Sequence, residues 1–208
     1  MCEHALALAD REGLETLTIR RLAGDLGVTP MALYWHFKNK DELLQALTEH
    51  ALAHITADLR HEDPWDVRLR VLVDTVVGAM RAHPCLPGLL ALVDKKRVES
   101  FQRATEATLS VLGEAGFPPR LQYWVASYLL MGCLSLVQNQ PAHLHLTEGE
   151  RAEQRRRERL ELESLPADRF PCTIAYAKTM DEPVDAAEFF AFGTDLLISG
   201  VRAMAPLP

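Results

Sequence analysis

The stretch that decides the fold is LTIRRLAGDLGVTPMALYWHFKNKDELL, residues 17–44. Thr18 is a favoured N-cap residue and Gly27 is a favoured helix-ending residue, so a helix is predicted over residues 19–26. Its apolar residues fall three or four apart, which places them on a single face: Ile19, Leu22, Ala23 and Leu26. This helix is therefore expected to bury one side against its neighbours.

A second helix is predicted directly after it, over residues 30–37. Thr29 is its N-cap, and Pro30 takes the first helical position, which proline favours. Each of the two helices also carries an apolar pair at the spacing of a hydrophobic staple, Leu17 with Leu22 and Val28 with Leu33. The pattern predicts two short helices joined by a tight turn of three residues.

The second of these helices is expected to expose an unusual set of side chains. If Leu33 and Phe37 face inward together with Val28, the residues left outside are Pro30, Met31, Tyr34, Trp35 and His36. Aromatic and hydrogen-bonding groups beside Lys38 and Lys40 suit a helix that enters the major groove of DNA. The alternative for Trp35 alone is a small core under the next helix, and for Arg20 alone a solvated surface arginine instead of a contact to guanine.

Residues 17–44 resemble the DNA-binding domain of the tetracycline-repressor (TetR) family. Fainter likeness to the dimer-forming helices of that family continues at Gly132–Leu134 and Phe189–Gly200. The resemblance implies a helix-turn-helix contact with double-stranded operator DNA through Thr18, Arg20, Thr29, Pro30, Met31, Tyr34, Trp35, His36 and Lys40. The first helix departs from the family pattern, which has several more residues, one of them basic, before Ala5.

Helical periodicity continues through the rest of the chain, and strand alternation is almost absent, so the fold class is predicted to be all-α. The helices expected outside the decisive stretch cover residues 3–12, 39–60, 65–82, 86–92, 95–115, 119–140, 171–179 and 185–204. The N-terminal helix-turn-helix domain, residues 1–45, is expected to be joined by a long helix to a helical ligand-binding and dimerisation domain, residues 46–208.

The distribution of charge is more informative than its sum. The 208 residues carry a net charge of −7, yet residues 18–40 hold four basic side chains against the single acid Asp25. A small cationic patch on an anionic body excludes a protein that coats nucleic acid with its whole surface. Four scattered cysteines suit a reducing cytoplasm, and neither a signal peptide nor a membrane span is indicated.

Two nearly apolar helices, at residues 121–137 and 185–204, are expected to be buried on two sides. Small residues on the first allow close approach of a neighbour. Two such helices from each subunit would form a four-helix interface, so a homodimer is predicted, with contacts through Ala126, Gly132, Cys133, Phe192, Leu196 and Leu197. A core within the chain is the alternative. A dimer would place two recognition helices about one DNA turn apart, roughly 34 Å.

The body is also expected to bind a small effector. Tetracycline sensors of the family hold a drug–magnesium chelate through a histidine and a glutamate, and Leu90 and Leu136 stand at the corresponding positions here. That difference indicates a pocket without metal or cofactor, for a largely apolar molecule. The candidate walls, each of which could equally be plain core, are Val76, Met80, Leu90, Leu109, Trp124, Tyr128 and Met131.

Two further segments of the sequence have candidate roles. Residues 148–163, with five arginines and six glutamates, are expected to form a solvated, exposed loop. His143 and His145, near Glu148 and Glu150, form a minor candidate for a metal site.

The main functional prediction is a ligand-responsive repressor, although activation is not distinguished from repression. The rival is a helical enzyme or carrier that retains the head, but neither a nucleophile–base pair nor a phosphate loop supports it.

Overall fold

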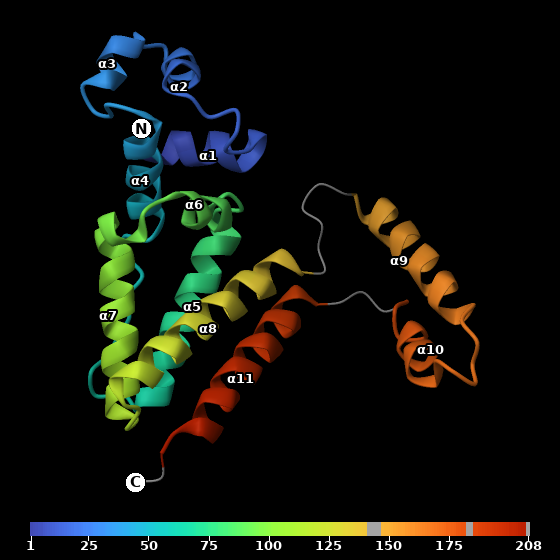
Figure 1. Ribbon diagram of the computed structural model, residues 1–208. Coiled ribbons are helices and arrows are strands. Elements are labelled where there is room, and N and C mark those ends of the chain that lie inside the picture. Colours follow the sequence, from blue (N-terminus) through green and yellow to red (C-terminus); the bar gives the residue numbers. More distant parts are fainter. Residues whose placement is uncertain (141–146, 182–184, 207–208) are drawn as a thin grey trace. The chain divides into compact units, whose positions relative to one another are not determined.

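The computed structural model describes residues 1–140, 147–181 and 185–206, and every regular element in these ranges is helical (Figure 1). The all-α prediction is confirmed. The elements are α1 (Cys2–Glu12), α2 (Ile19–Leu26), α3 (Pro30–Tyr34), α4 (Lys40–Ala51), α5 (Trp65–Ala82), α6 (Leu86–Leu92), the 3₁₀ helix η1 (Lys95–Arg97), α7 (Glu99–Glu114), α8 (Pro119–Gln138), α9 (Glu148–Glu163), α10 (Pro171–Ala177) and α11 (Ala186–Met204).

The chain divides into two compact units. The first contains Met1–Gln138 together with Thr194–Pro208, and the second contains Asn139–Gly193. Within the first unit we call α1–α4 the head, and α5–α8 with Thr194–Pro208 the body. The domain boundary expected after residue 45 lies inside α4, which connects head and body, and it stays a prediction.

In the head, α2 has the capping residues and the helix ends that the sequence predicts. The Thr18 hydroxyl accepts a hydrogen bond from the Arg21 N–H (3.1 Å), and α2 begins and ends where the sequence predicts. Gly27 closes α2 with φ of 67°, a left-handed conformation that glycine adopts without strain. Leu17 and Leu22 are fully buried, as their staple predicts.

Two details of the head differ from prediction. Helix α3 ends at Tyr34 instead of residue 37, because Asn39 adopts an extended backbone to cap α4 and the Lys38 N–H is held by the Glu42 carboxylate (2.9 Å). Val28 is 44% exposed, so the second staple is wrong. Its N–H donates to the Ala23 carbonyl to close α2, which turns its side chain to the outside.

The fourth helix is also shorter than predicted, because α4 ends at Ala51 and not near residue 60. The chain continues in tight turns, in which the Ile55 N–H donates to the Leu52 carbonyl and the Ala57 N–H to the His54 carbonyl. These turns keep Leu52 and Ile55 buried, which a straight helix would have carried past the body. The residues just after α4 therefore belong to the core of the body.

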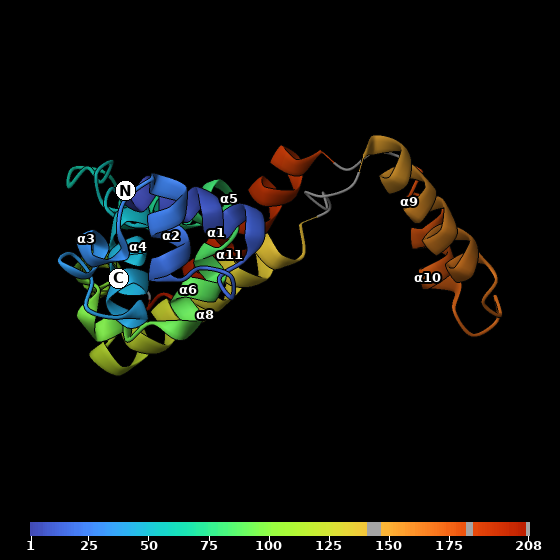
Figure 2. The same ribbon diagram turned by 90° about the horizontal axis from the view of Figure 1, so that it is seen from above.

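In the body, α5 packs against α7 and α8 (Figure 1). The buried guanidinium of Arg68 on α5 forms a two-pronged ion pair with Glu114 at the end of α7. The part of α11 in this unit runs beside α8 (Figures 1 and 2), and a Cβ placed on Gly132 would lie 2.6 Å from the Leu197 Cδ2. Gly132 thus permits the two helices to approach closely.

The second unit corrects the expectation of an exposed loop at residues 148–163, because this segment is helix α9. Thr147 and Glu150 form a reciprocal capping box, and the Arg, Glu and Leu residues that follow have high helix propensity. Arg159 on α9 pairs with Asp181 after α10 (2.6 Å). Charge balance without apolar periodicity is therefore compatible with a helix here.

Candidate DNA-binding surface and ligand cavity

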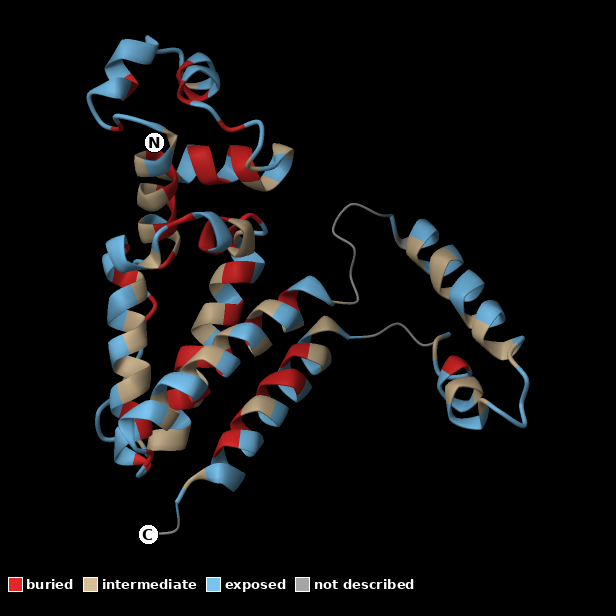
Figure 3. Ribbon diagram, in the orientation of Figure 1, coloured by how far each residue is buried: buried red, intermediate tan, exposed pale blue. Residues whose placement is uncertain are grey.

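The outward face of α3 carries large side chains that the head does not bury. Trp35 is 86% exposed, Met31 68% and Tyr34 44%. Leu33 and Phe37, four residues apart, are buried and anchor the segment. Figure 3 shows the ribbon of the head around α3 mostly in pale blue, the colour of exposed residues. Pro30 and His36 are also exposed. The structure therefore gathers on one surface the residues that the sequence predicts there, and the idea that Trp35 covers a small core is wrong.

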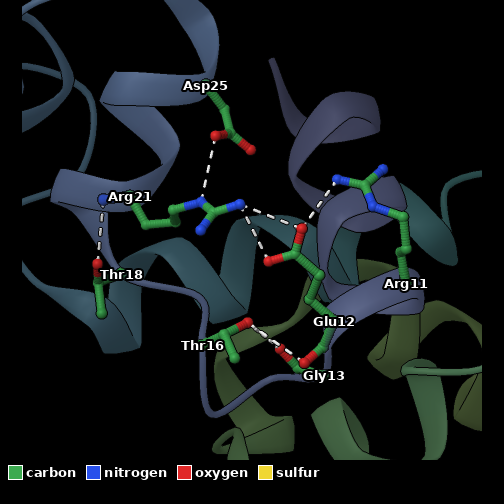
Figure 4. Close-up of polar contacts among 7 residues, drawn as sticks. All are labelled: Arg11, Glu12, Gly13, Thr16, Thr18, Arg21 and Asp25. Atoms are coloured by element: carbon green, nitrogen blue, oxygen red, sulfur yellow. Dashed lines mark hydrogen bonds and ion pairs between the residues drawn. The ribbon is translucent and has the colours of Figure 1, made fainter.

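The two adjacent arginines of α2, Arg20 and Arg21, have different surroundings, and Figure 4 shows those of Arg21. Arg21 lies between Glu12 of α1 (3.1 Å) and Asp25, one turn further along α2 (3.2 Å). Arg20 is exposed and forms no ion pair within the described part of the chain. Of the pair, Arg20 thus keeps its guanidinium available, while Arg21 ties α2 to α1.

The caps of α2 and α3 and the start of α4 carry the remaining predicted DNA contacts, Thr18, Thr29 and Lys40. The hydroxyls of Thr18 and Thr29 are used as N-caps, and both residues are exposed. Lys40 is half-buried, and its Nζ donates to the Leu14 carbonyl (3.0 Å). Its ammonium keeps two further protons, so the hydrogen bond fixes Lys40 at the start of α4 without using up its charge.

The body contains a partly open cavity of about 760 Å³ between α5, α7, α8 and the turns after α4. Most of its wall is apolar, with Leu52, Leu69, Val73 and Phe101 among the lining residues. The polar part of the wall consists of Lys95, Lys96, Gln102, Thr105, Thr108, Tyr123 and Ser127. The cavity is large enough for a drug-sized molecule.

The predicted pocket residues divide into two groups. Val76, Leu90 and Met131 line the cavity. Met80 is fully buried in the core, and the remaining three candidates, Leu109, Trp124 and Tyr128, are not part of the cavity wall. Trp124 instead stacks under the guanidinium of Arg120, 4.6 Å from its ring centre, on the surface of α8.

The predicted dimer residues also separate. Ala126 and Cys133 line the cavity, and burial raises the pKa of the Cys133 thiol to about 12. Gly132 receives Leu197 of the same chain. Phe192 and Leu196, one turn apart on α11, are 68% and 63% exposed. Of the predicted interface residues, Phe192 and Leu196 are thus the two that the single chain leaves strongly exposed.

Sequence reasoning did not find the polar wall of the cavity. The sequence predicts Lys95 and Lys96 at the start of a long helix, whereas they form the separate turn η1, capped by the Asp94 side chain. The signal was the run Asp94–Arg97, in which three basic residues follow an N-cap residue. Leu52 and Ile55 are not among the predicted pocket residues, because the sequence predicts a connecting helix that continues to residue 60, whereas the chain leaves the helix after Ala51.

Neither a membrane-spanning helix nor a cluster of metal-binding side chains is found among the residues that the structure describes. Within residues 1–140, 147–181 and 185–206, no helix is long and apolar enough to cross a membrane. The same ranges contain no group of three or more His, Cys, Asp or Glu side chains that could hold a metal ion. His143 and His145, the minor metal candidate, lie outside the described residues.

The head presents an exposed helix behind a tight turn and is joined to a helical body that contains a cavity. This arrangement is that of the helix-turn-helix transcriptional regulators. The family described as "Bacterial regulatory proteins, tetR family" matches residues 2–47, and "Tetracyclin repressor-like, C-terminal domain" matches residues 59–205. The chain belongs to the TetR family.

Three similar proteins illustrate the range of the family. The class C tetracycline repressor of Escherichia coli is 39% identical over 54% of this chain, which spans about half (52%) of that repressor. The class G repressor of Vibrio anguillarum is 28% identical, over 96% of this chain and 90% of its own length. Streptomyces coelicolor ActR, solved in complex with actinorhodin, is 25% identical, covers 99% of this chain and 96% of its own, and has a TM-score of 0.76.

Proposed function

We propose that this protein is a homodimeric repressor that binds a palindromic operator and releases it when a small, largely apolar molecule enters the body without a metal. The observation that carries the proposal is the outward set on α3, in which Trp35, Met31 and Tyr34 are exposed above buried Leu33 and Phe37. A helix of this kind fits the major groove, where side chains reach base edges and phosphates.

Two copies would be needed for tight binding. The exposed Leu196 on α11 and Tyr128 on α8 supply apolar side chains that a second copy can cover. A twofold dimer presents its two recognition helices to half-sites about one turn of DNA apart. The operator is therefore expected to be a palindrome.

The structure suggests how the cavity would communicate with DNA. Helix α4 begins at Lys40, close to α3, and the residues just after it, Leu52 and Ile55, line the cavity. A ligand that displaces these two residues would tilt α4 and change the distance between the two heads. This requires the ligand to bind the released state more tightly than the DNA-bound state.

The deciding experiment is a binding titration with DNA from upstream of the gene and from neighbouring genes, at several salt concentrations. The affinity should be sequence-selective and fall steeply with salt, because each phosphate contact releases counterions. Binding that is absent, or equal for all fragments, would contradict the proposal. Turnover of a bound compound, rather than its release unchanged, would favour the enzyme alternative.

A further inference from the structure

The charged groups on the cavity wall all have one sign. Lys95 and Lys96 line it, and among the described lining residues there is no aspartate, glutamate or histidine. This is notable in a chain with a net charge of −7. The acids nearest in sequence are engaged elsewhere, since Asp94 caps the Lys96 N–H (3.1 Å) and Glu99 pairs with Arg103 (2.8 Å). The wall is therefore locally cationic.

The lysine turn is also held in place. The Asp94 carboxylate caps η1 from one side, and the Gln102 amide donates to the Lys96 backbone carbonyl from the other. Gln102 lines the cavity as well. The turn is thus fixed to α7, and it holds half-buried Lys95 and exposed Lys96 at the wall of the cavity.

Three hydroxyl groups of the cavity wall donate their protons to backbone carbonyls of their own helices. Thr105 donates to the Phe101 carbonyl (2.9 Å), Thr108 to the Ala104 carbonyl (2.8 Å), and Ser127 to the Tyr123 carbonyl (2.8 Å). A hydroxyl has only one proton, so while these three bonds are kept each hydroxyl offers the cavity lone pairs. A ligand hydrogen-bond donor satisfies them without breaking the bonds to the helix.

We propose, on the basis of the proposed function, that the effector is an aromatic or otherwise apolar weak acid. Its anionic group is held by Lys95 and Lys96, and its hydroxyl or N–H donors face Thr105, Thr108 and Ser127. A cation or metal chelate would meet two positive charges, and no carboxylate lines the described wall beside them. A neutral ligand over the lysines would remove water from the ammonium groups without replacing its hydrogen bonds.

The anionic part is tested with a matched pair of fluorescent probes, 8-anilinonaphthalene-1-sulfonate and N-phenyl-1-naphthylamine, which share a skeleton and differ in the sulfonate. The full-length protein should bind the sulfonate more tightly. Replacing both lysines, Lys95→Gln with Lys96→Gln, should weaken the sulfonate at least five-fold and change the neutral probe less than two-fold. Lys178→Gln, at an exposed position on the second unit, controls for surface charge.

The donor part is tested with N-phenyl-1-naphthylamine and its N-methyl derivative, which lacks the N–H. The parent should bind at least three-fold tighter, and this preference should disappear in the combined variant Thr105→Val, Thr108→Val and Ser127→Ala. Circular dichroism of each variant checks that it is folded. A preference that persists in a folded variant would overturn this part of the assignment.

The outcomes separate this inference from the function on which it rests. Equal binding of sulfonate and neutral probe, or a lysine variant that weakens both equally, would overturn the weak-acid assignment while operator binding stands. Loss of salt-sensitive operator binding in the wild-type protein would overturn the regulator itself, whatever the probes do. A sulfonate probe that binds the wild type by way of the two lysines and releases DNA supports both.

Discussion

The Asp10 carboxylate accepts a hydrogen bond from the Cys85 backbone N–H at 2.9 Å, which links α1 of the head to the residue that precedes α6 of the body. Its other oxygen lies 3.0 Å from His83 Nδ1. Burial and the neighbouring Asp10 carboxylate raise the pKa of the Cys85 thiol, so this thiol stays protonated. Near the same place, Gly88 of α6 leaves room for the Leu14 side chain. The head is therefore attached to the body through α1 as well as through α4.

We expect Asp10→Ala to lower the free energy of unfolding by about 1–3 kcal/mol, because it leaves the partly buried Cys85 N–H without its acceptor. Urea unfolding followed by circular dichroism measures this. The matched control is Asp25→Ala, which removes only an exposed helix-surface pair with Arg21 and should cost about 0.5 kcal/mol or less. Equal costs for the two variants would show that the Asp10 contact contributes no special stability.

Much of the head could be predicted from the sequence because its signals are local. Caps such as Thr18 and Gly27 act on neighbouring residues, so they determine where α2 begins and ends. The end of α4 depends instead on which side chains the distant body buries, as Leu52 and Ile55 show. It is harder still to predict which residues line a cavity. Buried Met80 and cavity-lining Val76 lie one turn apart on the same helix and follow the same apolar periodicity.

A second prediction concerns acid stability. Burial raises the pKa of Glu49, but hydrogen bonds from the Ser100 N–H (2.9 Å) and hydroxyl, with the Arg103 charge, outweigh it, and the net pKa is lowered. A carboxylate with a lowered folded-state pKa stabilises the protein above its unfolded-state pKa, about 4.3, and loses this effect as pH falls through the folded-state value. Glu49→Gln should therefore lower the free energy of unfolding at pH 7, and should lower it by progressively less below pH 4.

Urea unfolding at pH 7, 5, 4 and 3 tests the Glu49 prediction. Glu106→Gln, an exposed glutamate on the same helix as Ser100, controls for the loss of one negative charge. If the difference between wild type and Glu49→Gln stays constant over this range, the ionised carboxylate does not stabilise the junction between α4 and α7.

The close packing of α8 and α11 gives a third prediction. Gly132→Ala places a Cβ 2.6 Å from Leu197 Cδ2, so the Leu197 side chain must shift. We expect the free energy of unfolding to fall by about 1–3 kcal/mol from overpacking, less the gain of up to about 1 kcal/mol in helix propensity. Gly78→Ala is the matched control, because no atom lies within 4 Å of a Cβ there, and it should stabilise by up to about 1 kcal/mol through helix propensity. Thermal unfolding of both variants that shifts in the same direction would contradict the packing account.

A fourth prediction concerns assembly. Leu196→Glu places a charge on the exposed apolar surface of α11, and a charge left without a partner in an interface is costly. Sedimentation should show a shift from dimer to monomer, together with weaker operator binding. Leu92→Glu, at an equally exposed leucine on α6, should leave the dimer unchanged. A dimer that persists in Leu196→Glu would place the interface elsewhere.

The last prediction separates recognition from stability in the head. Tyr34→Ala removes a half-exposed ring from α3, whereas Leu33 beside it is buried, so the melting temperature should fall by no more than about 2 °C. Operator affinity should fall by roughly ten- to a hundred-fold, the effect of losing about 1–3 kcal/mol of contact to DNA. Tyr176→Ala, at an exposed tyrosine on α10, should change neither property. A Tyr34→Ala protein that unfolds at a much lower temperature would show that this ring supports the fold, and the assignment of the α3 surface to DNA would lose its basis.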